Sequence, residues 1–272
     1  MKVAIQGIKG SFHHIVAEEY FGKNINLVEC MSFGEMPNLL LNKKAEVIVM
    51  AIENSIAGAI LPNYALIDDH NLTICGEYYL PIHHNLMALD GQKMEDIKEV
   101  YSHPMALLQC HKFFNDFPNI KLIEDTDTAA VAKRIQDNKL PGVAAIASTL
   151  AAEIYDLQII APEIQTIKEN STRFFILTNT ESKKSVSADK ASIKFTVSHE
   201  TGSLAQVLTI LAKHNLNLSK IQSMPVIETP WKYAFFADLI FDNYADYYHA
   251  IKEVKEKTEA LKVLGEYSKS KR

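Results

Sequence analysis

Hydroxyl and amide side chains follow several short apolar runs in this sequence, at points where a helical pattern begins. These junctions are Gly10-Ser11-Phe12, Glu53-Asn54-Ser55, Ser102-His103-Pro104, Thr126-Asp127-Thr128 and Ala147-Ser148-Thr149. In an open α/β sheet such junctions gather at the carboxyl ends of the strands, where helix N-termini present free N–H groups and partial positive charge. A single junction is more simply explained as a helix N-cap, which favours the same residue types. Together the five junctions indicate a crevice suited to a small anionic ligand.

A second segment with chemical potential is Asn170-Ser171-Thr172-Arg173-Phe174-Phe175-Ile176-Leu177, where hydroxyls and an arginine precede an apolar strand. The guanidinium of Arg173 offers a planar fork of donors that matches a carboxylate bidentately. A solvated arginine at a strand edge would give the same pattern. These residues alone leave both interpretations open.

Two histidine pairs raise the question of a metal. His13, His14 and Glu18 would share one helical region, and His83-His84 would start another strand. Adjacent side chains do not share one face of a helix or strand, and no HExxH spacing occurs, so no metal is expected. The segment Gly7-Ile8-Lys9-Gly10 is too short for a dinucleotide or Walker loop, so no nucleotide cofactor is expected either.

The elements that must position these residues alternate along the first 180 residues. Short β-branched runs predict strands, and apolar residues at helical spacing predict helices. The predicted strands are Lys2–Gln6, Glu46–Ile52, Leu72–Leu80, Val100–Ser102, Ile120–Glu124 and Val143–Ala147. The predicted helices are Phe12–Phe21, Phe33–Asn42, Ala106–Phe117, Thr128–Asn138 and Ser148–Tyr155. This alternation is typical of an α/β fold with a mostly parallel sheet.

A polar stretch at residues 179–190, NTESKKSVSADK, cannot bury a core and predicts a domain boundary. A compact unit with the order βαββα follows it. Its expected parts are a strand over Ser192–Ser198, a helix opening at Thr201-Gly202, runs near Leu216–Val226 and Tyr233–Phe241, a helix from Tyr244 and a possible last strand near Leu261–Leu264. This order predicts a small ferredoxin-like α+β sandwich.

Composition narrows the classes of function. The 272 residues carry a formal net charge of -5 with no concentrated basic stripe, so a nucleic-acid partner is not expected. No apolar run reaches the roughly 18 residues of a membrane span, and the start of the chain does not resemble a secretory signal, so a cytoplasmic protein is expected. The three cysteines Cys30, Cys75 and Cys110 are widely spaced, which favours buried free thiols.

Ordered motifs across nearly the whole chain resemble those of one enzyme family. They are Gly7-x-x-Gly10-Ser11-Phe12, Ile52-Glu53-Asn54-Ser55-x-x-Gly58, Gly76-Glu77 with the following LPIHH, Ser102-His103-Pro104 ending in Gln109-Cys110, Asp127-Thr128-Ala129-Ala130, Ala144-Ala145-Ile146-Ala147-Ser148, Ala152-Glu153-x-Tyr155-x-Leu157 and Asn170-x-Thr172-Arg173-Phe174. Their order and spacing are together specific, and in them the chain resembles a monofunctional prephenate dehydratase with a C-terminal ACT regulatory domain. Ile8 and His13 depart from the pattern, since proline and a serine or threonine are common at these positions.

The resemblance implies a catalytic domain over residues 1–180, a linker at 181–190 and an ACT domain over 191–272. The catalytic domain would have two α/β lobes, like a type II periplasmic binding protein, with the active site in the cleft. Residues 1–78 and 160–180 would form one lobe and 79–159 the other. The implied reaction converts prephenate to phenylpyruvate, carbon dioxide and water without a cofactor.

The resemblance also assigns roles to site residues. Thr172 is expected to donate a hydrogen bond to the leaving hydroxyl, within the catalytic motif that Phe174 completes. Arg173 is expected to hold the pyruvyl carboxylate, because a tight grip on the departing carboxylate would oppose decarboxylation. Residues expected to bind substrate or to line the cleft are Ser11, Glu53, Asn54, Ser55, Ser102, Gln109, Thr128 and Ser148.

In the ACT-like part, the two expected effector motifs are Gly202-Ser203-Leu204-Ala205 and Gln222-Ser223-Met224-Pro225. A helix N-terminus that begins with glycine can receive the carboxylate of an amino acid, and the implied effector is the end product, L-phenylalanine. Gln222 and Met224 replace two charged residues of the usual motif, so a charge pair that could support the effector site is missing. ACT domains usually pair, so a homodimer or homotetramer is expected.

Three alternatives remain open from the sequence. The two-lobed fold also serves non-catalytic anion-binding proteins. The substrate could be arogenate, the aminated relative of prephenate, which shares its leaving hydroxyl and ring carboxylate. The chain could also be an amino-acid sensor that has lost catalysis, although the presence of Thr172 and Arg173 argues against it.

Overall fold

The computed structural model describes residues 1–180, 187–226 and 229–270. The chain folds into two compact units, Met1–Asn63 with Tyr78–Phe174, and Tyr64–Glu77 with Phe175–Arg272. Residues 181–186 of the expected linker lie outside the described residues. The last residue of that linker, Lys190, is the first residue of a strand.

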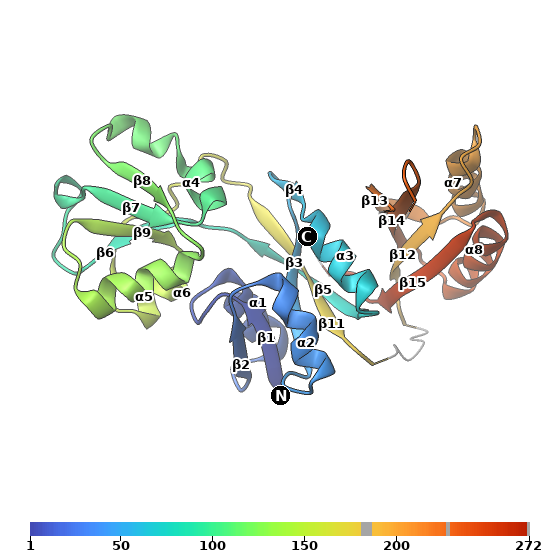
Figure 1. The fold of residues 1–272 in the computed structure, drawn as a ribbon, viewed down its shortest axis with the longest axis horizontal. Coiled ribbons are helices and arrows are strands. Elements are labelled where there is room, and N and C mark those ends of the chain that lie inside the picture. Colours follow the sequence, from blue (N-terminus) through green and yellow to red (C-terminus); the bar gives the residue numbers. More distant parts are fainter. Residues whose placement is uncertain (181–186, 227–228, 271–272) are drawn as a thin grey trace. The chain divides into compact units, whose positions relative to one another are not determined.

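The first sheet is built from both ends of the expected catalytic domain (Figure 1). Its strand order is β2 (Asn26–Cys30), β1 (Lys2–Gln6), β3 (Val47–Asn54), β11 (Ser171–Thr178) and β5 (Thr73–Pro81), with β4 (Gly58–Ala59) paired to β3. The helices of this part are α1 (Phe12–Phe21), α2 (Met36–Leu41) after the 3₁₀ turn η1 (Phe33–Glu35), and α3 (Leu61–Asp69). The run Ile48–Ile52 of β3 is buried residue by residue, as expected for a central strand covered on both faces.

The second sheet contains the middle of the chain. Its order is β10 (Gln158–Ala161), β6 (Asn85–Ala88), β9 (Val143–Ala147), β7 (Glu99–Ser102) and β8 (Lys121–Glu124). Its helices are α4 (Pro104–Cys110), α5 (Thr128–Asn138) and α6 (Thr149–Ile154), with the 3₁₀ turns η2 (Met94–Asp96) and η3 (Phe113–Asp116). The sheet is mixed rather than mostly parallel, because β6 runs antiparallel to both β9 and β10. The chain thus enters this sheet at β6 and returns to the first sheet at β11.

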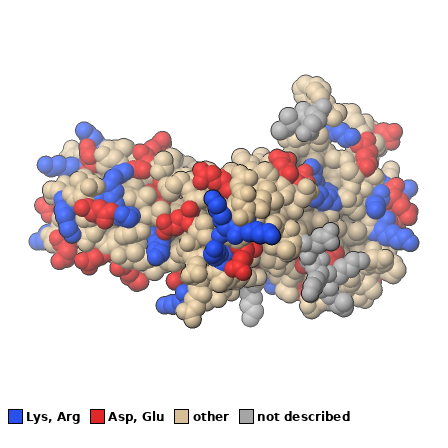
Figure 2. Space-filling model, turned by 60° about the horizontal axis from the view of Figure 1, so that its bottom comes forward, with Lys and Arg blue, Asp and Glu red and all other residues tan. Residues whose placement is uncertain are grey.

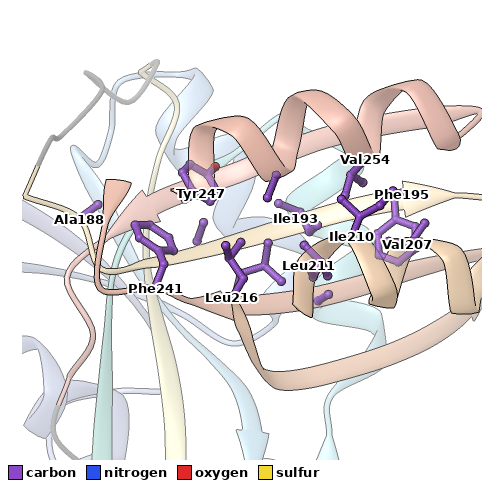
Figure 3. Packing of buried hydrophobic residues seen from close by; sticks show 14 residues of the cluster. Ala188, Ile193, Phe195, Val207, Ile210, Leu211, Leu216, Phe241, Tyr247 and Val254 are labelled. Atoms are coloured by element: carbon purple, nitrogen blue, oxygen red, sulfur yellow. The ribbon is translucent and has the colours of Figure 1, made fainter. Parts of the chain in front are cut away.

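The C-terminal sandwich has four antiparallel strands in the order β13 (Asn217–Pro225), β14 (Tyr233–Ile240), β12 (Lys190–Thr196) and β15 (Ala260–Tyr267). The helices α7 (Ser203–Lys213) and α8 (Tyr244–Lys257) pack on it. Figure 3 shows Val207 and Leu211 of α7 meeting Ile193 and Phe195 of β12. The order βαββαβ matches the predicted sandwich, including its last strand.

The segment Tyr64–Glu77 belongs to the same unit as this sandwich. The buried carboxylate of Glu77 accepts hydrogen bonds from Lys190 Nζ at 2.8 and 2.9 Å. Lys262 Nζ donates to Asp68 at 2.8 Å, and the ring of Tyr64 lies 5.1 Å from that of Phe236. The end of α3 and the start of β5 are therefore bonded to the sandwich by ion pairs and aromatic packing.

Three further features of the structure concern surface charge, the length of apolar helices and possible metal ligands. On the face shown in Figure 2, basic side chains are interspersed with acidic ones. No helix in the described part of the chain is long and apolar enough to cross a membrane. Within the same residues, no cluster of three or more His, Cys, Asp and Glu side chains could hold a metal ion.

Candidate active site

A cavity of about 240 Å³ lies in the first unit and is lined by residues from both sheets and their loops. Six of the residues expected at the site line it, namely Ser11, Asn54, Gln109, Thr128, Thr172 and Phe174. They come from five separate segments of the chain. The fold therefore brings together side chains that the sequence predicted to share one crevice.

The hydroxyl of Thr172 is oriented by Asn54. Nδ2 of Asn54 donates to Thr172 Oγ1 at 3.0 Å, while its Oδ1 accepts from the backbone N–H groups of Ile56 at 3.0 Å and Ala57 at 2.9 Å. Those two backbone donors fix which end of the amide is oxygen, since an N–H cannot donate to the NH₂ group. Among the described residues, the hydrogen of the Thr172 hydroxyl has no acceptor. It is therefore available to a ligand in the cavity.

The same amide group continues into a buried chain of polar side chains. Asn54 Nδ2 also donates to Asn170 Oδ1 at 2.7 Å, and Asn170 Nδ2 donates to Gln109 Oε1 at 2.8 Å. That oxygen also lies 2.9 Å from Nε2 of His84. Asn170 and His84 are almost fully buried. Hydrogen bonds that follow one another through a buried chain of this kind restrict its members to few arrangements.

Two helix N-termini add a hydroxyl and a carboxyl side chain to the cavity wall. Ser11 caps α1, its Oγ accepting from His14 N at 3.2 Å, and Asp127 caps α5, its Oδ1 accepting from Ala130 N at 2.7 Å. Burial raises the pKa of Asp127, assisted by the negative charges of Asp125 and Glu29. An anion bound in the same cavity would raise this pKa further.

Two histidines of the cavity wall are neutral. Burial lowers the pKa of His13 to about 3 and that of His84 to about 4. His13 Nε2 accepts from Ala51 N at 3.3 Å, and its ring lies edge-on to Phe174. Both rings therefore act as uncharged, hydrogen-bonding walls. Among the described lining residues there is no Lys or Arg.

Arg173, which was expected to hold the pyruvyl carboxylate, does not line this cavity. Successive side chains of a strand point to opposite faces, and Thr172 and Phe174 take the cavity face of β11. The guanidinium of Arg173 is buried, lies 3.8 Å from Glu53 Oε2 and sits over the ring of Tyr79 at 5.8 Å. Glu53 likewise does not line the cavity. Arg173 and Glu53 thus form an ion pair away from the cavity, with Arg173 on the opposite face of β11.

Three of the predicted serines have structural bonds instead of lining the cavity. Ser102 is fully buried and donates to Ile146 O at 2.7 Å. Ser148 caps α6 and donates to Gly10 O at 2.6 Å, which joins the two sheets' loops where Gly10 packs against Ala151. Ser55 Oγ accepts from Ser171 N at 2.9 Å. These serines cap a helix or form hydrogen bonds with the backbone. They therefore have the structural role that the sequence analysis gave as the simpler explanation of a single junction.

Sequence reasoning missed four residues of the cavity wall. They are His13, His84, His103 and Asp127. His13 and His84 attracted notice only as metal ligands. His103 and Asp127 were named only within the strand–helix junctions and the family motifs, without a role of their own. Their position beside the hydroxyl residues at the strand ends was the signal that could have found them.

A second cavity, of about 860 Å³, lies in the C-terminal unit. The first effector motif, Gly202-Ser203-Leu204-Ala205, lines it at the start of α7, together with Trp231. Gln222, Ser223, Met224 and Pro225 do not line it; they belong to β13, at the edge of the sheet. Gly202 has φ 89°, a left-handed conformation that suits glycine.

The fold and these cavities define a two-lobed α/β enzyme of small molecules that carries an α+β domain with a cavity of its own. A family model described as prephenate dehydratase matches residues 3–182, and one described as ACT domain matches residues 191–243. The chain belongs to the prephenate dehydratase family, whose members are carbon–oxygen lyases.

Individual relatives agree with this assignment. The chain is 35% identical over 272 residues to the bifunctional chorismate mutase/prephenate dehydratase of Aquifex aeolicus (strain VF5), covering 99% of this chain and 74% of that protein. The crystal structure of the prephenate dehydratase from Staphylococcus aureus subsp. aureus Mu50 is 26% identical, with a TM-score of 0.85 and coverage of 98% and 100%. Prephenate dehydratase from Arthrobacter aurescens in complex with L-Phe shares the fold at 24% identity, with a TM-score of 0.88 and coverage of 98% and 90%.

Proposed function

We propose that this chain converts prephenate to phenylpyruvate, carbon dioxide and water, the dehydration step of phenylalanine biosynthesis, with Thr172 as the donor to the leaving hydroxyl. The observation that carries the assignment of Thr172 is its hydrogen bond from Asn54. That bond occupies an acceptor site of the hydroxyl and leaves its O–H for the substrate. Membership of the prephenate dehydratase family supports the choice of substrate.

The reaction breaks two bonds of the cyclohexadiene ring. The C4–O bond breaks with its electron pair on the leaving hydroxide, which one proton from solvent converts to water. The bond to the ring carboxylate breaks as carbon dioxide leaves, its electron pair completes the aromatic ring, and aromatisation supplies the driving force. An alcohol is too weak an acid to give up its proton far ahead of C–O cleavage, so the Thr172 hydroxyl acts by a hydrogen bond that strengthens as charge builds on the leaving oxygen. Help of this kind contributes about 10² to 10⁴ in rate.

The carboxylates of prephenate would meet neutral donors in this cavity. The Gln109 amide and the hydroxyls of Ser11 and Thr128 lie in its wall. Neutral donors orient an anion without the strong ground-state stabilisation that a buried guanidinium would give to the departing carboxylate. Fixed dipoles in a small cavity can stabilise the transition state without reorganising at the moment of reaction.

Feedback inhibition is the second part of the proposal. L-Phenylalanine would bind in the cavity of the C-terminal unit, with its carboxylate at the start of α7 and its ring against Leu204 and Phe235. The Arthrobacter aurescens relative is described as a complex with L-Phe. We further propose that the enzyme acts in the cytoplasm as a homodimer or homotetramer, because ACT domains usually pair. A sedimentation mass equal to the monomer would contradict this assembly.

Turnover tests the proposed function. The purified protein is incubated near neutral pH with prephenate and, in parallel, with arogenate, and the products phenylpyruvate and phenylalanine are quantified against enzyme-free controls. We expect phenylpyruvate from prephenate well above the uncatalysed rate, and a decrease in that rate as L-phenylalanine is added. No turnover of prephenate would refute the proposal, and turnover of arogenate alone would transfer it to that substrate.

A further inference from the structure

His84 stands at the end of the polar chain that begins at Asn54, and none of the expected roles uses it. Its ring is 4% exposed, belongs to the cavity wall and packs edge-on against Phe12 at 5.5 Å. Its Nε2 lies 2.9 Å from Gln109 Oε1. A buried imidazole that contacts the side-chain amide of a cavity-wall residue is in a position to control the orientation of that amide.

The direction of each hydrogen bond in the chain can be followed from the backbone. The N–H groups of Ile56 and Ala57 fix the oxygen of Asn54, so the NH₂ of Asn54 must donate to Asn170. This fixes the oxygen of Asn170, so its NH₂ donates to Gln109 Oε1. Gln109 Oε1 can only accept, and the facing nitrogen of His84 must therefore carry a hydrogen.

The remaining ring nitrogen agrees with that conclusion. Nδ1 of His84 is buried and has no hydrogen-bond partner among the described residues. Because Nε2 already carries a hydrogen, a proton on Nδ1 would make the ring a buried cation whose second N–H has no acceptor, which is costlier than an unpaired neutral nitrogen. The geometry and the burial thus select one form of the ring, the neutral tautomer with hydrogen on Nε2.

The consequence falls on Gln109. Its oxygen accepts from two directions, from Asn170 and from His84, which holds the amide plane and turns the NH₂ group away from both. Nε2 of Gln109 has no hydrogen-bond partner among the described residues, and Gln109 lines the cavity. A donor held in this way matches a carboxylate oxygen.

We propose that His84, as the neutral Nε2–H tautomer, is a positioning residue that fixes the Gln109 amide so that its NH₂ donates to a carboxylate of the bound substrate. The inference deepens the proposed function and rests on it for the identity of the substrate. It assigns His84 no contact with the reacting atoms. Its effect therefore belongs to substrate binding more than to bond breaking.

The tautomer can be read without any substrate. Two-bond ¹H–¹⁵N spectra of the protein with ¹⁵N-labelled histidine distinguish protonated from unprotonated ring nitrogens, and His84→Gln assigns the signal by its loss. We expect a neutral ring with hydrogen on Nε2 at pH 7. A hydrogen on Nδ1, or a cationic ring, would overturn the proposal whether or not the protein turns over prephenate.

Kinetics on prephenate test the action through Gln109. His84→Leu removes the donor, whereas the amide of His84→Gln can reach the place of Nε2 and restore it. We expect His84→Leu to raise KM by about 10- to 100-fold, the effect of losing one hydrogen bond to a charged group, with a smaller change in kcat. His84→Gln should recover most of that loss. The matched control is His83→Leu, since the side chain of His83 is 47% exposed and does not line the cavity.

A double-mutant cycle decides whether the two residues act as one unit. If His84 acts through Gln109, then His84→Leu adds little to the KM of Gln109→Ala. Additive effects, or an equal effect of His83→Leu, would overturn the inference. A wild-type protein with no turnover would refute the proposed function instead, while the ring spectra would still decide the orientation of the network.

Discussion

The side-chain amide of Asn54 donates to the hydroxyl of Thr172 across 3.0 Å, joining two residues that are 118 positions apart in the sequence. They meet because β3, which ends in Asn54, belongs with β11 to the centre of the first sheet. The sequence between them builds the second sheet and part of the cavity wall, including His84 and Gln109. The return of the chain through β11 is thus the step of the fold that completes the site.

Changing Asn54 to aspartate should reverse the hydrogen bond to Thr172. The carboxylate can still accept from the N–H groups of Ile56 and Ala57, so the turn is kept, but it can only accept from the Thr172 hydroxyl. We expect kcat of Asn54→Asp on prephenate to fall about 10²- to 10⁴-fold. Asn54→Ala removes the donor to the Thr172 hydroxyl but adds no acceptor for its hydrogen. The kcat of this variant should therefore fall less. An aspartate variant with the kcat of wild type would contradict the assigned direction.

Replacing Arg173 by lysine should affect stability more than substrate binding. The variant keeps the charge near Glu53 but loses the planar group over the ring of Tyr79. We expect a decrease in the free energy of unfolding of about 1 to 3 kcal/mol, measured by urea denaturation. The KM for prephenate should rise less than in Gln109→Ala. A large rise in KM at unchanged stability would return Arg173 to the role of carboxylate anchor.

Arg173 also illustrates what sequence could predict. The apolar run after Arg173 predicted a strand, which the structure extends back to Ser171 as β11. The predicted helices Phe12–Phe21 and Thr128–Asn138 match α1 and α5 residue for residue. The direction of each side chain was harder to predict, because the sequence does not show which residues of Thr172-Arg173-Phe174 point to the cavity. The family motif places the three together, and only the alternation of the strand separates them.

The sequence also failed to predict several contacts between segments that are far apart along the chain. Short or weakly alternating segments such as β2 and β10 were not predicted, since a strand of four or five residues depends on its neighbours more than on its own sequence. The role of His84 was hidden for the same reason. Its partner Gln109 is 25 positions away, and the Asn170 that completes the arrangement is 61 positions beyond Gln109.

A charge at Gly202 should weaken feedback without changing basal catalysis. The left-handed conformation at this position is tolerated by asparagine and aspartate, and nothing lies within 4 Å of an added Cβ. Aspartate would repel the carboxylate of L-phenylalanine, and asparagine is its neutral match. We expect Gly202→Asp to bind L-phenylalanine more weakly than Gly202→Asn in calorimetric titrations. Equal affinities would argue against effector binding at the start of α7.

Acidification should destabilise the protein through its neutral histidines. The pKa values of His13 and His84 are lowered from 6.5 to about 3 and about 4, so below pH 6.5 the unfolded chain takes up protons that the folded chain refuses. Their stabilising contribution is complete above pH 6.5 and is lost as the pH falls toward those values. The slope is at most about 1.4 kcal/mol per pH unit for each group. Urea denaturation from pH 7 to 5 should give a shallower slope for His84→Gln than for wild type, and equal slopes would exclude a neutral, buried His84.

The most direct measurement is the single-turnover rate of phenylpyruvate formation by wild type, Thr172→Ser and Thr172→Val, with enzyme in saturating excess over prephenate. Valine keeps the shape of threonine without its hydroxyl, and serine keeps the hydroxyl. We expect Thr172→Val to lose about 10²- to 10⁴-fold in rate and Thr172→Ser to retain most of it. A valine variant that forms phenylpyruvate as fast as wild type would contradict the claim that the hydroxyl oriented by Asn54 assists the departure of water.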